Sequence, residues 1–132
     1  MVEDNPADVQ LAREAIKESG IPYFLKVTGD GEEAMDYLLS RDGEADLECP
    51  DIILLDLKLP GKDGMQVLAE IKQDPDLKRI PVIILATSSD TGDVERAYAV
   101  HANCYIIKPA DYDKFAEVIR SIVNYWSSVV KI

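Results

Sequence analysis

The 132-residue sequence lacks the segments that carry a protein into or across a membrane. No apolar run approaches the roughly 20 residues that span a bilayer. Charged and turn-forming residues follow Met1 at once, where a secretory signal needs an apolar stretch. We therefore expect a cytoplasmic protein with no membrane partner.

Cysteine and histidine are also scarce. Cys49 and Cys104 are the only cysteines, too few for a disulfide scaffold, so we expect free thiols. His101 is the only histidine, and no pair of cysteines or histidines has the spacing of zinc ligands. These absences exclude disulfide-rich secreted domains and zinc modules.

Positive charge is outnumbered, because 14 Lys and Arg residues face 25 Asp and Glu residues and the net charge is -11. Such a surface repels phosphate backbones, so we expect no nucleic-acid partner. The surplus of negative charge would favour binding of a metal ion or of a basic protein surface, although a solvated acidic surface explains it equally well. The length and the 47% hydrophobic fraction indicate one domain, residues 1–132, with one core.

Short apolar runs alternate with amphipathic stretches, a pattern that indicates βα units around a parallel sheet. We expect helices over 7–19, 32–40, 65–73, 93–101 and 112–130, and strands over 23–27, 52–55, 82–86 and 104–107. Only Met1 and Val2 stand where the first strand should be. Either that strand is clipped or the natural protein has residues upstream of Met1, and we favour the second explanation.

Acidic side chains follow two of the expected strands. Glu3 and Asp4 follow the first strand and Asp56 follows the third, at the edge where doubly wound sheets bind ligands. Gathering carboxylates there costs energy through repulsion, which a hard divalent cation such as Mg²⁺ would remove. Lys108 follows the fifth apolar run and would place a positive charge for an anion such as phosphate at the same edge.

Each of these residues has an ordinary structural explanation when taken alone. Asp56 could form a turn, Glu3 and Asp4 could cap the first helix, and Lys108 could be a solvated loop lysine. Their joint order is more specific: an acidic pair, an Asp followed by Leu-Pro-Gly-x-Asp-Gly, a strand ending in Ala-Thr-Ser, then Tyr-x-x-Lys-Pro. This order favours a phosphoryl site.

The segments 2–6, 51–64 and 105–109 resemble the signature of response-regulator receiver domains. The loop 44–49 and the run 103–105 are similar to single-domain regulators that partner phytochrome-type sensor histidine kinases. The resemblance implies a doubly wound, flavodoxin-like (βα)5 fold with a five-stranded parallel sheet in the order 2-1-3-4-5 and a truncated first strand. It also implies a two-component response regulator that assists its own phosphorylation and dephosphorylation and is otherwise not an enzyme.

The resemblance assigns roles to individual positions. Asp56 is the phospho-acceptor, and Lys108 pairs with the phosphoryl oxygens. Glu3, Asp4, Asp56 and the backbone carbonyl of Lys58 hold Mg²⁺. The chemistry agrees with these roles, because a carboxylate is a weak nucleophile and a metal with a lysine neutralises the transferring oxygens.

The resemblance also implies a switch. Tyr105 matches an aromatic residue that rotates on activation, although a partly buried strand tyrosine is the alternative. The usual Ser or Thr at the end of the fourth strand is replaced by Ala86, so we expect the next residue, Thr87, to bind the phosphate. A cis Lys108–Pro109 peptide bond is expected to aim Lys108 into the site.

Two other functions compete with this interpretation. A haloacid-dehalogenase-like phosphatase needs a second Asp two residues after the first, where this chain has Lys58. A pseudo-receiver that only docks would lack the acceptor or the acidic pair.

No room for an output domain is expected after Val130, so output would be a conformational change or phosphotransfer to a histidine phosphotransfer protein or another downstream protein. Tyr125 and Trp126 would suit a homodimer surface or the core.

Overall fold

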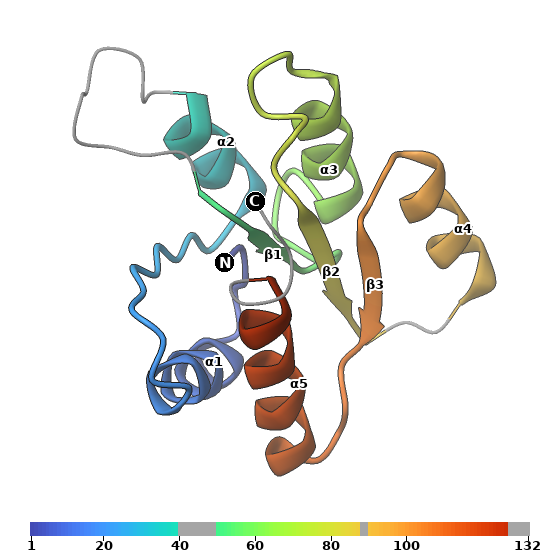
Figure 1. Cartoon of the computed structure of the whole chain (residues 1–132). Helices are drawn as coiled ribbons and strands as arrows, with labels where there is room; N and C mark the ends of the chain where they lie inside the picture. Colours follow the sequence, from blue (N-terminus) through green and yellow to red (C-terminus); the bar gives the residue numbers. More distant parts are fainter. Residues whose placement is uncertain (40–49, 88–89, 127–132) are drawn as a thin grey trace.

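The computed structural model describes residues 1–39, 50–87 and 90–126 (Figure 1). Its elements are α1 (Pro6–Glu18), α2 (Gly31–Leu39), β1 (Ile53–Leu55), α3 (Gly64–Gln73), β2 (Val82–Ala86), α4 (Thr91–Ala99), β3 (Cys104–Ile107) and α5 (Tyr112–Asn124). Among these residues, no helix is long and apolar enough to cross a membrane. Cys104 is a free thiol, whereas Cys49 and the loop 44–49 lie outside the described residues.

The sheet has the strand order expected from the sequence. Strands β1, β2 and β3 are parallel neighbours in that order. Val2 extends the sheet through single parallel bridges to Leu55 on one side and Thr28 on the other. Across the sheet the order is therefore Thr28, Val2, β1, β2 and β3. Numbered along the chain, this is the 2-1-3-4-5 order of a flavodoxin-like fold.

The expected strand over 23–27 is wrong. A strand needs partners for its N–H and C=O groups, and the first segment offers only a short ladder. Thr28 forms the hydrogen bonds of that ladder. Its N–H donates to the carbonyl oxygen of Met1 at 3.0 Å, and its own carbonyl oxygen accepts from the Glu3 N–H at 3.0 Å. Pairing with Val2 is thus confined to one residue on each side.

The helices begin at capping residues that hold the preceding loops at the carboxyl edge of the sheet. Asn5 caps α1, its Oδ1 accepting from the Ala7 N–H at 2.9 Å, and Asp63 forms a capping box with Gln66 on α3. Asp111 caps α5 in the same way. These caps fix the loops that follow Val2, β1 and β3, where the expected functional residues lie.

The predicted boundaries of one helix needed correction. Helix α4 begins at Thr91 instead of residue 93 because Asp90 caps it, and it ends at Ala99. His101, expected inside the helix, has φ +73° and lies beyond the helix end. Helix α5 extends from Tyr112 to Asn124, and residues 127–130 of the longer expected helix lie outside the described residues.

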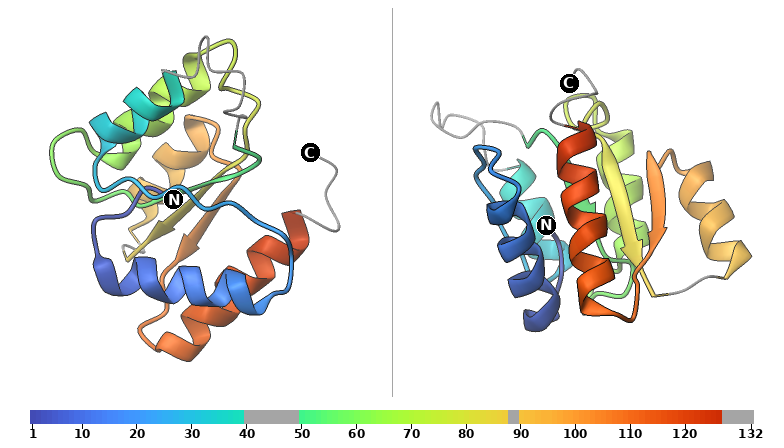
Figure 2. Two further views of the ribbon diagram at one scale, coloured as in Figure 1. Left: turned by 90° about the vertical axis from the view of Figure 1, so that its left-hand side faces the viewer. Right: turned by 60° about the horizontal axis from the view of Figure 1, so that its bottom comes forward.

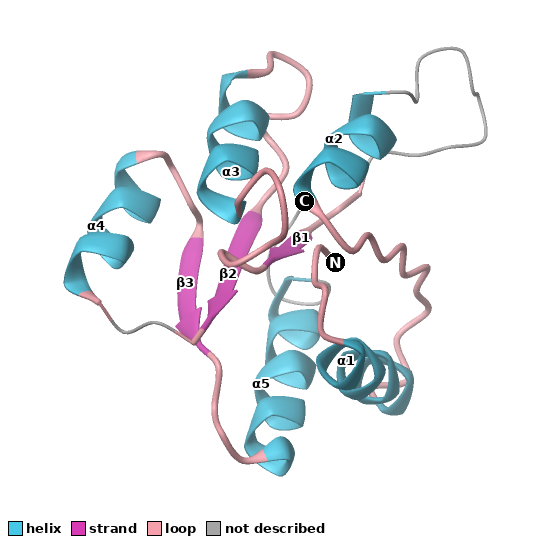
Figure 3. Ribbon diagram, turned by 180° about the vertical axis from the view of Figure 1, so that it is seen from behind, coloured by secondary structure: helices cyan, strands magenta, loops and turns pink. Residues whose placement is uncertain are grey.

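The sheet lies between two layers of helices, with α2, α3 and α4 on one face and α1 and α5 on the other (Figures 2 and 3). Successive strand side chains point to opposite faces. Ile84 packs with Leu68 in the first layer, while Ile83 packs with Ile119 in the second. All four side chains are fully buried. The central strands therefore consist of uninterrupted apolar residues, as their sequence indicated.

A polar cluster lies at the amino end of β2. The ammonium of Lys72, in the last turn of α3, donates to the carbonyl oxygens of Ile80 at 2.9 Å and Lys78 at 3.1 Å, and to Oδ1 of Asn103 at 3.1 Å. The same Oδ1 accepts from the Val82 N–H at 2.9 Å. Burial lowers the pKa of Lys72. This cluster joins α3, β2 and the segment that leads into β3.

Candidate functional site

Three carboxylates meet at the carboxyl edge of the sheet. Oxygen atoms of Glu3, Asp4 and Asp56 all lie within 4.8 Å of one another. Glu3 and Asp4 follow Val2, and Asp56 is the first residue after β1, with its N–H donating to the Val2 carbonyl at 3.1 Å. Converging carboxylate oxygens are the ligands that hard divalent cations prefer. The donor set therefore fits a divalent metal ion.

Glu3 is almost completely buried, with 3% of its surface exposed. Its Oε2 accepts from the N–H groups of Asp4 at 3.1 Å and Asn5 at 3.3 Å, and its Oε1 accepts from the Lys108 ammonium. Burial and the Asp56 charge together raise the pKa of Glu3 to about 7, although Lys108 opposes them. A charged Glu3 therefore depends on a neighbouring cation.

Lys108 lies among carboxylates just after β3. Its backbone N–H donates to the Ala86 carbonyl at 2.7 Å, which fixes the residue at the end of β2. Its Nζ contacts Glu3 Oε1, lies 3.0 Å from Asp8 Oδ2 and 3.6 Å from Asp56 Oδ2, and only 7% of the side chain is exposed. Burial alone would lower the pKa of Lys108, but hydrogen bonds to Glu3 and Asp8 and the Asp56 charge raise it. The lysine is thus held in its charged form.

The expected cis bond between Lys108 and Pro109 is wrong, because the described residues contain no cis peptide bond. The trans form of an X–Pro bond is favoured by roughly 0.5–1 kcal/mol. Lys108 reaches Glu3 and the neighbourhood of Asp56 from the trans backbone. A cis bond is therefore not needed to aim its side chain into the site.

Asp8 joins the site without having been predicted. It lies in the first turn of α1, and its carboxylate accepts a hydrogen bond from Lys108 although the two residues are 100 positions apart in the chain. In the sequence, an acidic residue three positions after the Asn5 cap indicates only a favourable helix dipole. Its location near the carboxyl edge was the signal that could have singled it out.

The loop after β1 holds the backbone close to Asp56. The Lys58 N–H lies 3.4 Å from Asp56 Oδ1, while the Lys58 residue as a whole is exposed. Gly64, which begins α3, donates to the Leu57 carbonyl at 2.8 Å. A Cβ atom at Gly64 would lie 2.1 Å from the Asp56 carbonyl oxygen, so only glycine fits. In the sequence this glycine closes the motif Leu-Pro-Gly-x-Asp-Gly, which does not by itself indicate the steric role.

Comparison with known proteins identifies the family. A sequence model of the response regulator receiver domain matches residues 1–120. Response regulator Rcp1 of Synechocystis sp. is 43% identical over 130 residues, covering 98% of this chain and 88% of Rcp1. The chain belongs to the response regulator receiver domain family. This receiver domain is a two-component response regulator, and the family implies a phosphodonor such as a histidine kinase.

Solved structures agree with this receiver-domain assignment. The crystal structure of the phosphorylated cyanobacterial phytochrome response regulator RcpA is 47% identical with a TM-score of 0.92, covering 98% of this chain and 93% of that one. The Mn²⁺-bound form of Rcp1 is 44% identical with a TM-score of 0.90, covering 99% and 94%. Neither the haloacid-dehalogenase-like phosphatase nor the pseudo-receiver is favoured by these relatives.

The residues that the resemblance implied as a switch lie at the end of β2 and in β3. Ala86 ends β2 with 2% of its surface exposed, and the exposed Thr87 begins a bend. Both line a pocket of about 170 Å³, which also contains Lys58. Tyr105 pairs with Ile84 in the sheet and packs partly buried against the same core layer. The strand thus ends at Ala86, the position that the ungapped spacing indicated.

Proposed function

We propose that this receiver domain accepts a phosphoryl group on Asp56 from a sensor histidine kinase in the cytoplasm. The observation that carries the proposal is the Lys108 ammonium, which lies 3.6 Å from Asp56 Oδ2 beside the converging carboxylates of Glu3 and Asp4. Mg²⁺ would be held by the carboxylates of Glu3, Asp4 and Asp56 and the backbone carbonyl of Lys58. The Mn²⁺-bound form of Rcp1 supports a divalent ion in such a site.

The transfer itself needs little covalent chemistry from the protein. An oxygen of the Asp56 carboxylate attacks the phosphorus, the bond to the donor's imidazole nitrogen breaks, and the leaving imidazole takes up a proton. Lys108 donates a hydrogen bond to a phosphoryl oxygen and balances its charge. A bound Mg²⁺ would supply further neutralisation of the carboxylates and phosphoryl oxygens. The product is an acyl phosphate on Asp56.

The response to this acyl phosphate involves Tyr105 and the end of β2. Ala86 provides no hydroxyl, so one hydrogen bond to the phosphoryl group is missing unless the exposed Thr87 supplies it. We expect coupling between Asp56 and Tyr105 to be weaker for that reason. Ala86→Thr should strengthen the response to beryllofluoride, whereas loss of the response in Thr87→Ala would make Thr87 the working hydroxyl.

Partners follow from the family and its relatives. The likeness to the phytochrome response regulator RcpA supports a phytochrome-type sensor kinase as donor. Output would be a conformational change or onward transfer to a histidine phosphotransfer protein or another downstream protein. The exposed Tyr125, whose ring meets Trp126 edge-on at 5.8 Å, would suit a homodimer contact.

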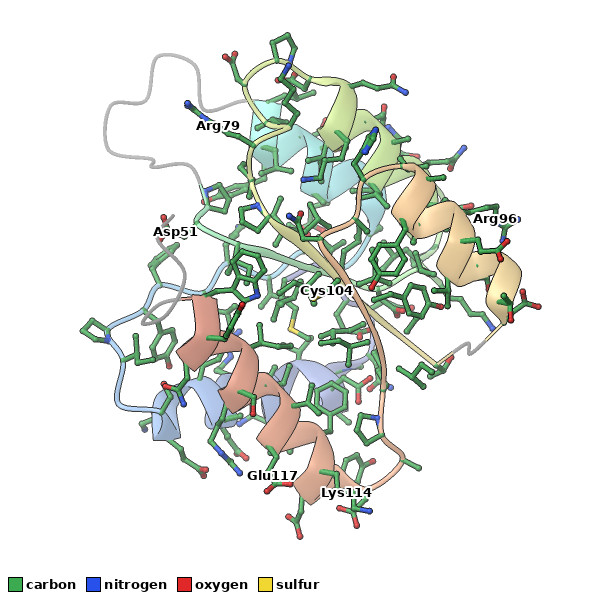
Figure 4. All side chains as sticks on the ribbon, turned by 45° about the vertical axis from the view of Figure 1, so that its right-hand side comes forward. Asp51, Arg79, Arg96, Cys104, Lys114 and Glu117 are labelled. Atoms are coloured by element: carbon green, nitrogen blue, oxygen red, sulfur yellow. The ribbon has the colours of Figure 1, made fainter. Side chains whose placement is uncertain are left out.

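The test is phosphorylation by acetyl phosphate, followed by intact-protein mass spectrometry. With Mg²⁺ present, the intact chain should gain one phosphoryl group, and Asp56→Asn should lose most of the labelling. Asp51→Asn is a matched control, because Asp51 is an exposed residue at the opposite end of β1 (Figure 4). Labelling of Asp56→Asn as full as that of the intact chain would contradict the proposal, as would labelling that persists without divalent metal.

A further inference from the structure

Asp8 links α1 to the lysine of the site. Its Oδ2 atom lies 3.0 Å from Lys108 Nζ, and only 15% of its side chain is exposed. Helix α1 itself is held in place by its packing against α5 (Figure 2). Asp8 is not among the residues whose carboxylate oxygens cluster as possible metal ligands in the described part of the chain. Its direct contact with the site is therefore the hydrogen bond from Lys108, and its charge acts on the site from a distance.

The three N–H donors of the Lys108 ammonium can be assigned. One bonds Glu3 Oε1 and another bonds Asp8 Oδ2. Asp56 Oδ2 lies at 3.6 Å, beyond normal hydrogen-bond distance. Among the residues that the structure describes, the third donor makes no hydrogen bond and is left for the acceptor, and the two other bonds determine where the ammonium lies.

We propose that Asp8 is a positioning residue that, together with Glu3, holds the Lys108 ammonium with one donor available to the phosphoryl group. This inference deepens the proposed function and rests on it. A long lysine side chain has many rotamers, and fixing it beforehand removes that entropy cost from the transfer step. Asp8 thus contributes to the rate although it touches neither the acceptor nor the donor.

Two other effects of Asp8 must be separated from positioning. Its negative charge repels an incoming phosphoryl group, so its removal could accelerate the reaction. Its place in the first turn also stabilises α1 through the helix dipole. Asp8→Asn removes the charge but keeps an acceptor oxygen for Lys108, whereas Asp8→Ala removes both. If Asp8 positions Lys108, the intact chain should react fastest, Asp8→Asn more slowly and Asp8→Ala slowest. If repulsion by the Asp8 charge dominates, both variants should react faster than the intact chain.

The experiment measures the rate of phosphorylation by acetyl phosphate at saturating Mg²⁺, and Mg²⁺ affinity separately by calorimetry. Asp8→Ala should slow the reaction about tenfold, the lower end for losing a hydrogen bond to a charged group. Its Mg²⁺ affinity should fall only by the loss of one nearby negative charge, because the proposed ligands remain, and saturating Mg²⁺ removes that loss from the rate comparison. Asp113→Ala is the matched control, since Asp113 occupies the first turn of α5, and it should not alter the rate.

A second background decides whether Asp8 acts through Lys108. In the Lys108→Met background, adding Asp8→Ala should slow phosphorylation less than it does in the intact chain. The same addition should also change the free energy of unfolding in metal-free buffer less than it does in the intact chain. If Asp8→Ala does not fold, Asp8→Asn carries the same comparison with a smaller loss. An Asp8→Ala rate equal to or above that of the intact chain, or an equal loss in both backgrounds, would overturn the inference. Labelling that survives Asp56→Asn would instead refute the proposed function.

Discussion

Two partly buried lysines lie at opposite ends of the sheet and behave oppositely. Lys108, after β3, is surrounded by the carboxylates of Glu3, Asp8 and Asp56, and its pKa is raised despite the opposing effect of burial. Lys72, near the start of β2, donates hydrogen bonds to three neutral oxygens, and burial lowers its pKa. Burial acts in the same direction on the pKa of both lysines, and the charged partners of Lys108 reverse its effect there.

The difference also separates the roles of the two lysines. The Lys72 ammonium satisfies carbonyl oxygens at a junction of three segments, so its contribution is to stability. Lys108 lies within an excess of negative charge, because Glu3, Asp4, Asp8 and Asp56 outnumber the single ammonium. Such an excess is costly unless further positive charge binds. A lysine in surplus negative charge is therefore suited to a site that gains a cation.

The largest expected effect is on phosphorylation. Lys108→Met should slow labelling by acetyl phosphate about 10- to 100-fold, since a hydrogen bond to a charged group is worth roughly 1.5–3 kcal/mol. Lys72→Met, the same substitution at the other end of the sheet, should label at the rate of the intact chain. Equal slowing of both variants would show that the two lysines do not differ in function.

The free energy of unfolding should separate the two lysines in the opposite way, with Lys72→Met destabilising the fold whether or not Mg²⁺ is present. Lys72→Met should lower the free energy of unfolding by about 1–3 kcal/mol, because the partly buried Ile80 carbonyl loses its donor. Urea unfolding should give the same loss with and without Mg²⁺, whereas the effect of Lys108→Met should depend on Mg²⁺. A Lys72→Met loss below about 0.5 kcal/mol, the range of surface substitutions, would contradict the role of this cluster.

The sequence could predict Lys108 but not Lys72. Lys108 follows a strand within a motif, and parallel topology brings strand ends together, so its approach to Asp56 follows from order along the chain. The partners of Lys72 include backbone carbonyls at Lys78 and Ile80, and every residue has a carbonyl. Nothing in residue identity indicates which carbonyls a tertiary fold will bring to an ammonium.

The other differences have the same origin. Ungapped spacing along the chain placed Ala86 at the end of its strand, and Ala86 is the last residue of β2. The partnership of Asp8 with Lys108 depends on how α1 packs, which periodicity does not specify. The strand expected over 23–27 failed because local β propensity was considered without its pairing partner. Motif order thus predicted the centre of the site, and packing determined its surroundings.

Changing a neutral partner of Lys72 into a charged one tests the comparison directly. Asn103→Asp keeps the acceptor oxygen that binds Lys72 and the Val82 N–H, and the exposed position lets the second oxygen meet water. We expect a gain of about 0.5–1 kcal/mol at neutral pH, the range of a favourable partly exposed ion pair. Asn103→Ala, the control, should lose about 1–2 kcal/mol because it leaves the Val82 N–H without this acceptor.

The smallest expected effect is on the alkaline pH dependence of stability. Since the pKa of Lys72 is lowered in the folded chain, the unfolded chain binds more protons at pH values between that lowered pKa and 10.5. Stability contributed by this group therefore rises with pH in that interval. Lys72→Met lacks the contribution, so its stability deficit should widen as pH rises through that interval towards 10.5. In Asn103→Asp the new carboxylate raises the pKa of Lys72, so the widening should shrink or reverse. Urea unfolding of the variants across this range measures both trends, and a deficit that stays constant with pH would show that burial does not lower the pKa of Lys72.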